Sequence, residues 1–278
     1  MTDAGRVTTT GDAAGGRYTH GHAESVLRSH RWRTAANSAA HLLPHLRPGL
    51  DLLDVGAGPG TITADLAELV APGAVTAVEV SEEAAAVTRD GLASRGVAAE
   101  VRVADVHALP FDDGSFDVVH AHQVLQHVAD PVQALREMAR VARPGGLVAV
   151  RDSDYHGFVW APASPALDRW LQLYDVVARG NGGDPDAGRH LVRWAREAGL
   201  EVLSATSSTW CFAEPADREW WGGLWADRLT RTTLGEQIVT AGLADPGELA
   251  EIAAGWRAWA DDPDGWFSVL HAELLVRA

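Results

Sequence analysis

Short apolar runs alternate with amphipathic segments between residues 50 and 151. The runs have the length of buried strands, and the segments between them carry apolar residues at helical spacing. Parallel strands need a crossover with room for a helix, so the alternation predicts a mostly parallel sheet with helices on both faces. The predicted strands are Leu52–Val55, Val75–Val80, Val101–Ala104, Val118–His120 and Leu147–Val150.

The N-terminal region has a different pattern. Residues 1–16 are small and polar, which predicts a disordered leader. Apolar positions between Ala23 and Leu43 recur at the spacing of one or two helices. We therefore predict that residues 17–48 form a helical cover over one large domain, residues 49–278.

The region after Arg151 combines helices, strands and many tryptophans. Ten of the eleven tryptophans lie from Trp160 onward. Because tryptophan buries a large apolar area, this crowding favours a packed cap, with an aromatic-lined substrate pocket as the second interpretation. We predict helical cap insertions at about 156–182 and 213–266, and strands near 202–208 and 270–276.

Composition limits the partners that the chain can have. The formal charge is −15 and every basic side chain except histidine is an arginine. An acidic chain repels phosphate groups, so we expect a small-molecule partner and neither nucleic acid nor membrane, and a homodimer stays open. No long apolar run or signal peptide is visible, which predicts a cytoplasmic location. The single cysteine, Cys211, excludes an internal disulfide and is predicted to be buried.

A glycine-rich turn follows the first predicted strand, in LLDVGAGPGT. Glycine allows positive φ and lets a ligand approach the backbone. Gly56, Gly58 and Gly60 form G-x-G-x-G, whereas the dinucleotide fingerprint needs G-x-G-x-x-G or an alanine in its last place, where Thr61 stands here. The turn therefore predicts a ligand site, but not one for a pyrophosphate.

Two acidic residues follow the next two strands. Glu79 ends the second strand, about twenty residues beyond the turn, where a carboxylate can accept hydrogen bonds from both hydroxyls of a ribose. Asp105 ends the third strand, where it can accept from an adenine amine while the backbone near Val106 meets a ring nitrogen. Together these residues predict a nucleoside site.

Four segments resemble class I S-adenosylmethionine-dependent methyltransferases, of the group similar to ubiquinone and menaquinone biosynthesis methyltransferases. They are LLDVGAGPGT, AVEVS, ADVHALPFDDGSFDVVHAHQVLQHVADP and LREMARVARPGGLVAVRD, in the order that the family has. The resemblance implies an α/β, Rossmann-like fold with seven strands in the order 3-2-1-4-5-7-6 and strand 7 antiparallel. It also implies S-adenosyl-L-methionine as the cofactor.

The resemblance places cofactor contacts on the turn, after the strands and in the N-terminal cover. Tyr18 is the candidate for a contact near the sulfonium or the methionyl carboxylate, because an aromatic face attracts a cation. The full set of expected cofactor residues is Tyr18, Arg33, Asp54, Gly56, Ala57, Gly58, Glu79, Val80, Asp105, Val106 and His122.

Methyl transfer is an in-line displacement, so the protein chiefly aligns the reactants and excludes water. A hydroxyl or acidic carbon as acceptor would also require a base. The candidates for catalysis are His127, after the fourth strand, and Asp152 and Tyr155, after the fifth. Carboxylates that alternate along an extended segment face opposite ways, so we expect no metal there.

Two alternatives stay open at this point. A Rossmann-fold NAD(P)-dependent oxidoreductase would use the same strand, turn and acidic residue, and a non-catalytic protein could bind S-adenosylmethionine only to sense it. The tryptophans favour an apolar or aromatic acceptor, such as a specialised metabolite.

Overall fold

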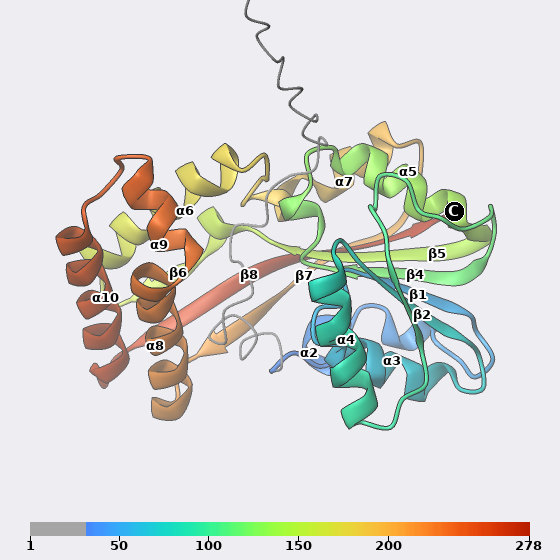
Figure 1. Ribbon diagram of the computed structural model, residues 1–278, viewed down its shortest axis with the longest axis horizontal. Coiled ribbons are helices and arrows are strands. Elements are labelled where there is room, and N and C mark those ends of the chain that lie inside the picture. The colour runs from blue at the N-terminus through green and yellow to red at the C-terminus, as the bar shows by residue number, and fades with distance from the viewer. Residues whose placement is uncertain (1–31) are drawn as a thin grey trace, which may run out of the picture.

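The computed structural model describes residues 32–278 (Figure 1). One mixed sheet runs through the molecule in the order β3-β2-β1-β4-β5-β8-β6, and β7 pairs with the other side of β8. Strands β1 to β5 are parallel, whereas β8 is antiparallel to β5, β6 and β7. The strands are β1 Leu52–Val55, β2 Val75–Glu79, β3 Glu100–Val103, β4 Phe116–His122, β5 Ala142–Ser153, β6 Val159–Ala161, β7 Glu201–Phe212 and β8 Trp266–Arg277.

The predicted α/β fold and strand order are confirmed. Strands β8 and β7 correspond to the predicted strands 7 and 6, and the antiparallel strand lies next to β5, where it was expected. One short strand was not predicted: β6 pairs with β8 over Trp266–Ser268, beyond the part of β8 that pairs with β5.

Helices cover both faces of the sheet (Figure 1). One face packs against α5 and α7, and the other packs against α2, α3 and the residues that follow α2. Local sequence sets where these helices begin: Ser81 and Asp130 each cap a helix by accepting a backbone N–H, and Pro131 occupies the first turn, where its missing N–H costs nothing. The helices are α2 Ala35–Ser38, α3 Thr61–Val70, α4 Glu82–Ser94, α5 Pro131–Val141 and α7 Ala187–Glu197.

The described part of the predicted N-terminal cover contains little helix. Only α2 and the short 3-10 helix η1, Leu43–His45, are helical between residues 32 and 48. Residues 17–31, and the predicted leader before them, lie outside the described residues.

A helical cap stands at one end of the sheet, beside the extended ends of β7 and β8 (Figure 1). The cap insertion predicted at about 213–266 contains three helices, and α6 is the fourth helix of the cap. These helices are α6 Pro165–Gly180, α8 Pro215–Arg231, α9 Thr233–Thr240 and α10 Pro246–Asp261.

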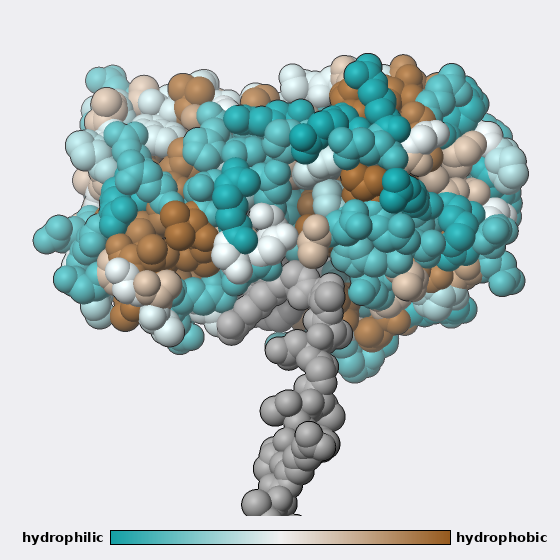
Figure 2. Space-filling model, turned by 90° about the horizontal axis from the view of Figure 1, so that it is seen from above, coloured by the Kyte–Doolittle hydropathy of each residue, from teal (hydrophilic) through white to brown (hydrophobic). Residues whose placement is uncertain are grey.

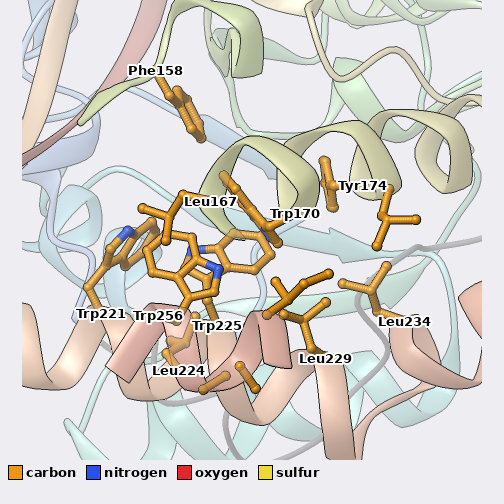
Figure 3. Close-up of a cluster of buried hydrophobic side chains, with 14 of the residues drawn as sticks. Phe158, Leu167, Trp170, Tyr174, Trp221, Leu224, Trp225, Leu229, Leu234 and Trp256 are labelled. Atoms are coloured by element: carbon orange, nitrogen blue, oxygen red, sulfur yellow. The ribbon is translucent and has the colours of Figure 1, made fainter. Parts of the chain in front are cut away.

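The cap has its own aromatic core (Figure 3). The Trp170 ring lies 4.5 Å from Trp225 and 4.9 Å from Trp256, both edge-on, and all three side chains are fully buried. Phe267 of β8 stacks on Trp160 at 5.6 Å and contacts Trp256 at 5.5 Å. The tryptophans therefore pack the cap, as predicted, and fasten it to β8.

The surface is mostly hydrophilic on the face that Figure 2 shows, with apolar residues in separate patches. Among residues 32–278, no helix is both long and apolar enough to cross a membrane. Cys211 is exposed, against the prediction of a buried side chain, because it points to the opposite face of β7 from its buried neighbours Trp210 and Phe212.

Replacing Trp170 with alanine tests the aromatic core. We expect Trp170→Ala to lower the free energy of unfolding by about 3–5 kcal/mol, because it removes a fully buried ring and leaves a cavity. Urea unfolding followed by far-ultraviolet circular dichroism measures this. Trp266→Ala, at a side chain that is 39% exposed, is the control and should cost about 1 kcal/mol or less. Equal losses in the two variants would contradict the core described above.

Candidate active site

One cavity opens at the carboxyl ends of the parallel strands and continues under the cap. Its first part, the cofactor end, is formed by the glycine-rich turn and the segments after β2 and β3. Its second part, the acceptor end, is formed by the segments after β4 and β5, by β7 and by α8. The cofactor end is lined by residues including Asp54, Gly56, Ala57, Thr61, Glu79, Val80, Asp105, Val106 and His107. The acceptor end is lined by residues including Trp32, Arg33, Gln123, His127, Ser153, Tyr155, Phe158, Trp210, Trp220, Trp221, Trp225 and Arg228.

The glycine-rich turn has the backbone that the sequence predicted. Gly56, Gly58 and Gly60 have φ values of 69°, 56° and 74°, which favour glycine. A Cβ on Gly56 would stand only 2.5 Å from a methyl group of Val124, so a larger residue could not fit without moving that side chain.

The buried Asp54 carboxylate stabilises this turn. Its side chain is buried and lies 2.7 Å from Nδ1 of His120 on β4. It also accepts a hydrogen bond of 2.5 Å from the Thr63 hydroxyl in the first turn of α3. The carboxylate thus ties the two strands and the helix that surround the turn.

Glu79 is positioned by the backbone of the turn. Its Oε1 accepts a hydrogen bond of 2.5 Å from the Gly58 N–H, and its Oε2 accepts one of 3.3 Å from the Val80 N–H. Gly58 itself does not line the cavity, against its expected contact with the cofactor, and its N–H is directed to Glu79 instead.

Asp105 stands at the mouth of the cofactor end. It accepts hydrogen bonds from the backbone N–H of His107 at 2.9 Å and from that ring at 2.7 Å. Burial raises the pKa of Asp105, but the hydrogen bonds from His107 outweigh it, so the net shift is downward. The carboxylate is therefore ionised at neutral pH and can accept further hydrogen bonds.

Aromatic rings form the walls of the acceptor end. Tyr155 stacks on Tyr174 at 4.1 Å, and Trp210 lies 5.2 Å from Trp32. The indole N–H of Trp210 donates to the backbone oxygen of Asn37 at 2.8 Å, which fixes the start of the described chain against β7. Rings of the cap therefore also line this end, and its use as a substrate pocket stays a prediction.

The protonation of His127 follows from its neighbours. The backbone N–H of Ser153 donates to Oε1 of Gln126 at 3.2 Å, which identifies the oxygen of that amide. The amide nitrogen then faces Nε2 of His127 at 3.0 Å and must donate to it. The ring is thus neutral with its proton on Nδ1. Burial, followed by the charges of Arg33 and Arg228, lowers the pKa of His127 to about 3.

Two of the residues predicted for catalysis line the cavity and one does not. His127 and Tyr155 are on its wall, whereas Asp152 is fully buried outside it. Successive side chains of a strand face opposite ways, and Ser153 is the neighbour that faces the cavity. The Asp152 carboxylate instead accepts the backbone N–H of Gln126 at 3.0 Å, so the expected contact with substrate is corrected to a structural one.

The N-terminal candidates have different outcomes. Arg33 lines the acceptor end, with its guanidinium carbon 5.4 Å above the Trp210 ring, while His122 lies between the two ends. Tyr18 lies outside the described residues. The sequence reasoning missed Gln123, whose φ of 54° is rare for a residue other than glycine, and Arg228, which no motif marks.

A group of potential metal ligands lies away from the cavity wall. His156, Asp175 and Asp186 could share an ion by geometry. The Arg179 guanidinium already lies 2.9 Å from Asp175 and 2.7 Å from Asp186, and it supplies the positive charge there. The expectation of no metal stays a prediction.

Known proteins match both the sequence and the fold. A methyltransferase domain model matches residues 53–150. An uncharacterised methyltransferase of Schizosaccharomyces pombe is 32% identical over 269 residues, which cover 94% of this chain and 96% of the relative. A ubiquinone/menaquinone biosynthesis C-methyltransferase of Idiomarina loihiensis is 40% identical over 136 residues, 48% of this chain and 51% of that one. A Bacillus halodurans structure described as a methyltransferase has a TM-score of 0.58 at 21% identity, covering 86% of this chain and 97% of that one.

The strand order and the glycine-rich turn define a class of Rossmann-like α/β proteins. Within that class, the chain belongs to the methyltransferase family. The match to the yeast relative is long enough to include the cap, whereas the quinone enzyme matches only about half of the chain. Nothing in these comparisons favours the oxidoreductase alternative.

The structural role of Asp152 predicts a pH-dependent effect of Asp152→Asn. Burial raises the pKa of Asp152 to about 7, against the opposing backbone hydrogen bonds from Gln126 and Leu125. A carboxyl whose pKa is raised on folding stabilises the fold less as the pH rises from about 4 to 7. The variant has no proton to lose, so its unfolding free energy relative to wild type should increase by roughly 2–3 kcal/mol between pH 5 and pH 8.

Denaturant unfolding of both proteins at the two pH values measures this difference. Asp112→Asn, at an exposed loop residue, is the control and should show no such change. A difference for Asp152→Asn that stays constant with pH would contradict the buried, protonatable carboxyl.

Proposed function

We propose that this protein transfers a methyl group from S-adenosyl-L-methionine to a small molecule with an apolar or aromatic body. The observation that carries this proposal is the continuity of the cavity, in which an end built for a nucleoside opens directly onto an end lined by aromatic rings. A methyl donor and its acceptor must share one enclosed space for an in-line transfer. Membership of the methyltransferase family supports the same reaction class.

The residues of the cofactor end fit S-adenosylmethionine. Glu79, held by the turn, would accept the ribose hydroxyls, and Asp105 would accept the adenine amine beside the backbone of Val106. The tight turn at Gly56 and Ala57 leaves backbone exposed for the amino-acid part. A positively charged cofactor also suits an end whose charged side chains, among the described residues, are the carboxylates of Asp54, Glu79 and Asp105.

S-adenosylmethionine brings an already activated methyl group, so the chain's own residues chiefly orient the acceptor and exclude water. His127 is neutral, and the lone pair of its Nε2 is used by Gln126. Burial raises the pKa of the Tyr155 hydroxyl, which therefore stays protonated. Both side chains are suited to position an acceptor by hydrogen bonding, and neither is suited to remove a proton.

Calorimetric titration with S-adenosylmethionine, S-adenosylhomocysteine and NADH tests the cofactor. We expect micromolar binding of the first two and none of NADH. Glu79→Gln should weaken binding at least tenfold, about 1.4 kcal/mol, because it removes the charge that accepts the ribose hydroxyls. Glu83→Gln, at an exposed position on α4, is the matched control and should bind as wild type does. Binding of NADH alone, or equal affinities in the two variants, would refute the assignment.

A further inference from the structure

Gln123 has an unusual backbone conformation. Among residues 32–278, it is the only residue other than glycine with a positive φ, 54°. This conformation is strained for a residue that has a Cβ, and it persists only where the surrounding structure fixes it. Here the Gln123 backbone N–H donates to the Arg151 carbonyl of β5 at 2.7 Å. Strain of this kind gathers at functional sites, and Gln123 lies on the cavity wall.

The place of Gln123 is the junction of the two ends of the cavity. His122, the residue before it, lines the cavity between the two ends. Val124, the residue after it, packs a methyl group against the glycine-rich turn, so closely that a Cβ on Gly56 would lie 2.5 Å away. An acceptor must present its nucleophilic atom to the methyl group at this junction. The side chain of Gln123 is therefore next to the reacting groups.

Buried hydrogen bonds fix the direction of the Gln123 amide. His271 of β8 is fully buried, and its Nδ1 lies 3.1 Å from the Val269 carbonyl, which can only accept. Burial keeps the pKa of His271 well below its usual value, so the ring is neutral and carries its proton on Nδ1. Its Nε2 must then accept, and the amide nitrogen of Gln123 donates to it at 2.9 Å.

The amide oxygen of Gln123 is directed to the contents of the cavity. Within the described chain no group donates to Oε1, and this atom is not among the fully enclosed polar atoms there, so it is accessible on the wall. Ser153, on the same wall, donates its hydroxyl proton to Gln126 at 2.5 Å and has only lone pairs to offer. Both oxygens can accept a hydrogen bond, which suits a ligand that donates one.

We propose that Oε1 of Gln123 binds the O–H or N–H group of the molecule to be methylated, and that His271 is the positioning residue that orients the amide. The site thereby selects a hydroxyl or an amine as the acceptor, on an apolar or aromatic body. An amide oxygen accepts a hydrogen bond without taking up the proton, so Gln123 orients the acceptor and does not serve as a base. This proposal rests on the proposed function for the nature of the ligand, but recognition of the donor can be tested without turnover.

A pair of matched probes isolates this hydrogen bond. 2-Naphthol and 2-methylnaphthalene have the same rings, and the O–H donor of the first is replaced in the second by a methyl group of similar size. Calorimetry on the full chain saturated with S-adenosylhomocysteine gives the ratio of their affinities. We expect Gln123→Met, which keeps the length of the side chain and removes the amide, to shift this ratio about fivefold or more toward 2-methylnaphthalene.

The matched control is a second glutamine outside the cavity wall. Gln133 of α5 also donates one hydrogen bond through its amide, to the His107 carbonyl at 3.2 Å. Gln133→Met should leave the affinity ratio of the two probes unchanged.

Two further variants separate recognition from folding. Gln123→Gly removes the side chain and suits the positive φ, so it should unfold at the temperature of wild type or higher while showing the shifted ratio. His271→Phe keeps a ring in place but removes the acceptor that orients the amide. It should shift the ratio in the same direction, by about twofold or more, with S-adenosylhomocysteine affinity unchanged.

Thermal unfolding and S-adenosylhomocysteine affinity are measured on every variant. Loss of S-adenosylhomocysteine binding in wild type would refute the proposed function, and the probes would then be titrated alone. Three results would overturn the role of Gln123. They are failure of 2-naphthol to bind wild type at about 1 mM, a ratio that folded Gln123→Met and Gln123→Gly leave unchanged, and a loss of S-adenosylhomocysteine affinity in these variants without a change in the ratio, which would assign the amide to the cofactor.

Discussion

The backbone pairing of β8 is the constraint on which the cap and the acceptor end of the cavity depend. Over His271–Arg277, β8 pairs with β5 on one side and with β7 on the other. Over Trp266–Ser268, it pairs with β6. At about 3.4 Å per residue, a strand of 12 residues reaches from the sheet core into the cap. Phe267 then packs among the cap tryptophans. The cap is thereby held over the carboxyl edge of the parallel strands, and the acceptor end exists because of this attachment.

Alternation along β5 decides which side chains reach the cavity. Ser153 faces it, and the Arg151 guanidinium carbon lies 5.0 Å from the Trp210 ring, whereas Asp152 and Asp154 turn toward η2, Leu125–His127, and α7. Arg189 of α7 donates to the Asp154 carboxylate at 2.5 and 2.7 Å, which ties α7 to the segment after β5. The acidic residues Asp152 and Asp154 thus brace the helices behind the site and do not line the cavity.

The cofactor end could be predicted from the sequence because it is local. A strand, the glycine-rich turn after it and the end of the next strand bring Gly56 and Glu79 close together. Their spacing in the sequence is therefore enough to predict this end of the cavity. The acceptor end is assembled from β7, α8 and the residues before α2, which meet only after the cap has packed. No hydrophobic periodicity or sequence motif marks Arg228 as a cavity residue. The prediction for Asp152 was wrong because a position at the end of a strand does not specify which face of the sheet the side chain is on. The conformation of Gln123, whose backbone N–H donates to the Arg151 carbonyl at 2.7 Å, likewise cannot be predicted until β4 is placed beside β5.

A crystal structure of the full chain with S-adenosylhomocysteine tests the central claim, a single cavity in which a nucleoside site opens onto an aromatic-lined end. The account predicts the ribose hydroxyls on Glu79, the adenine beside Asp105, and the sulfur atom facing the acceptor end. Nucleoside density elsewhere, or a sulfur atom that faces away from the acceptor end, would contradict it.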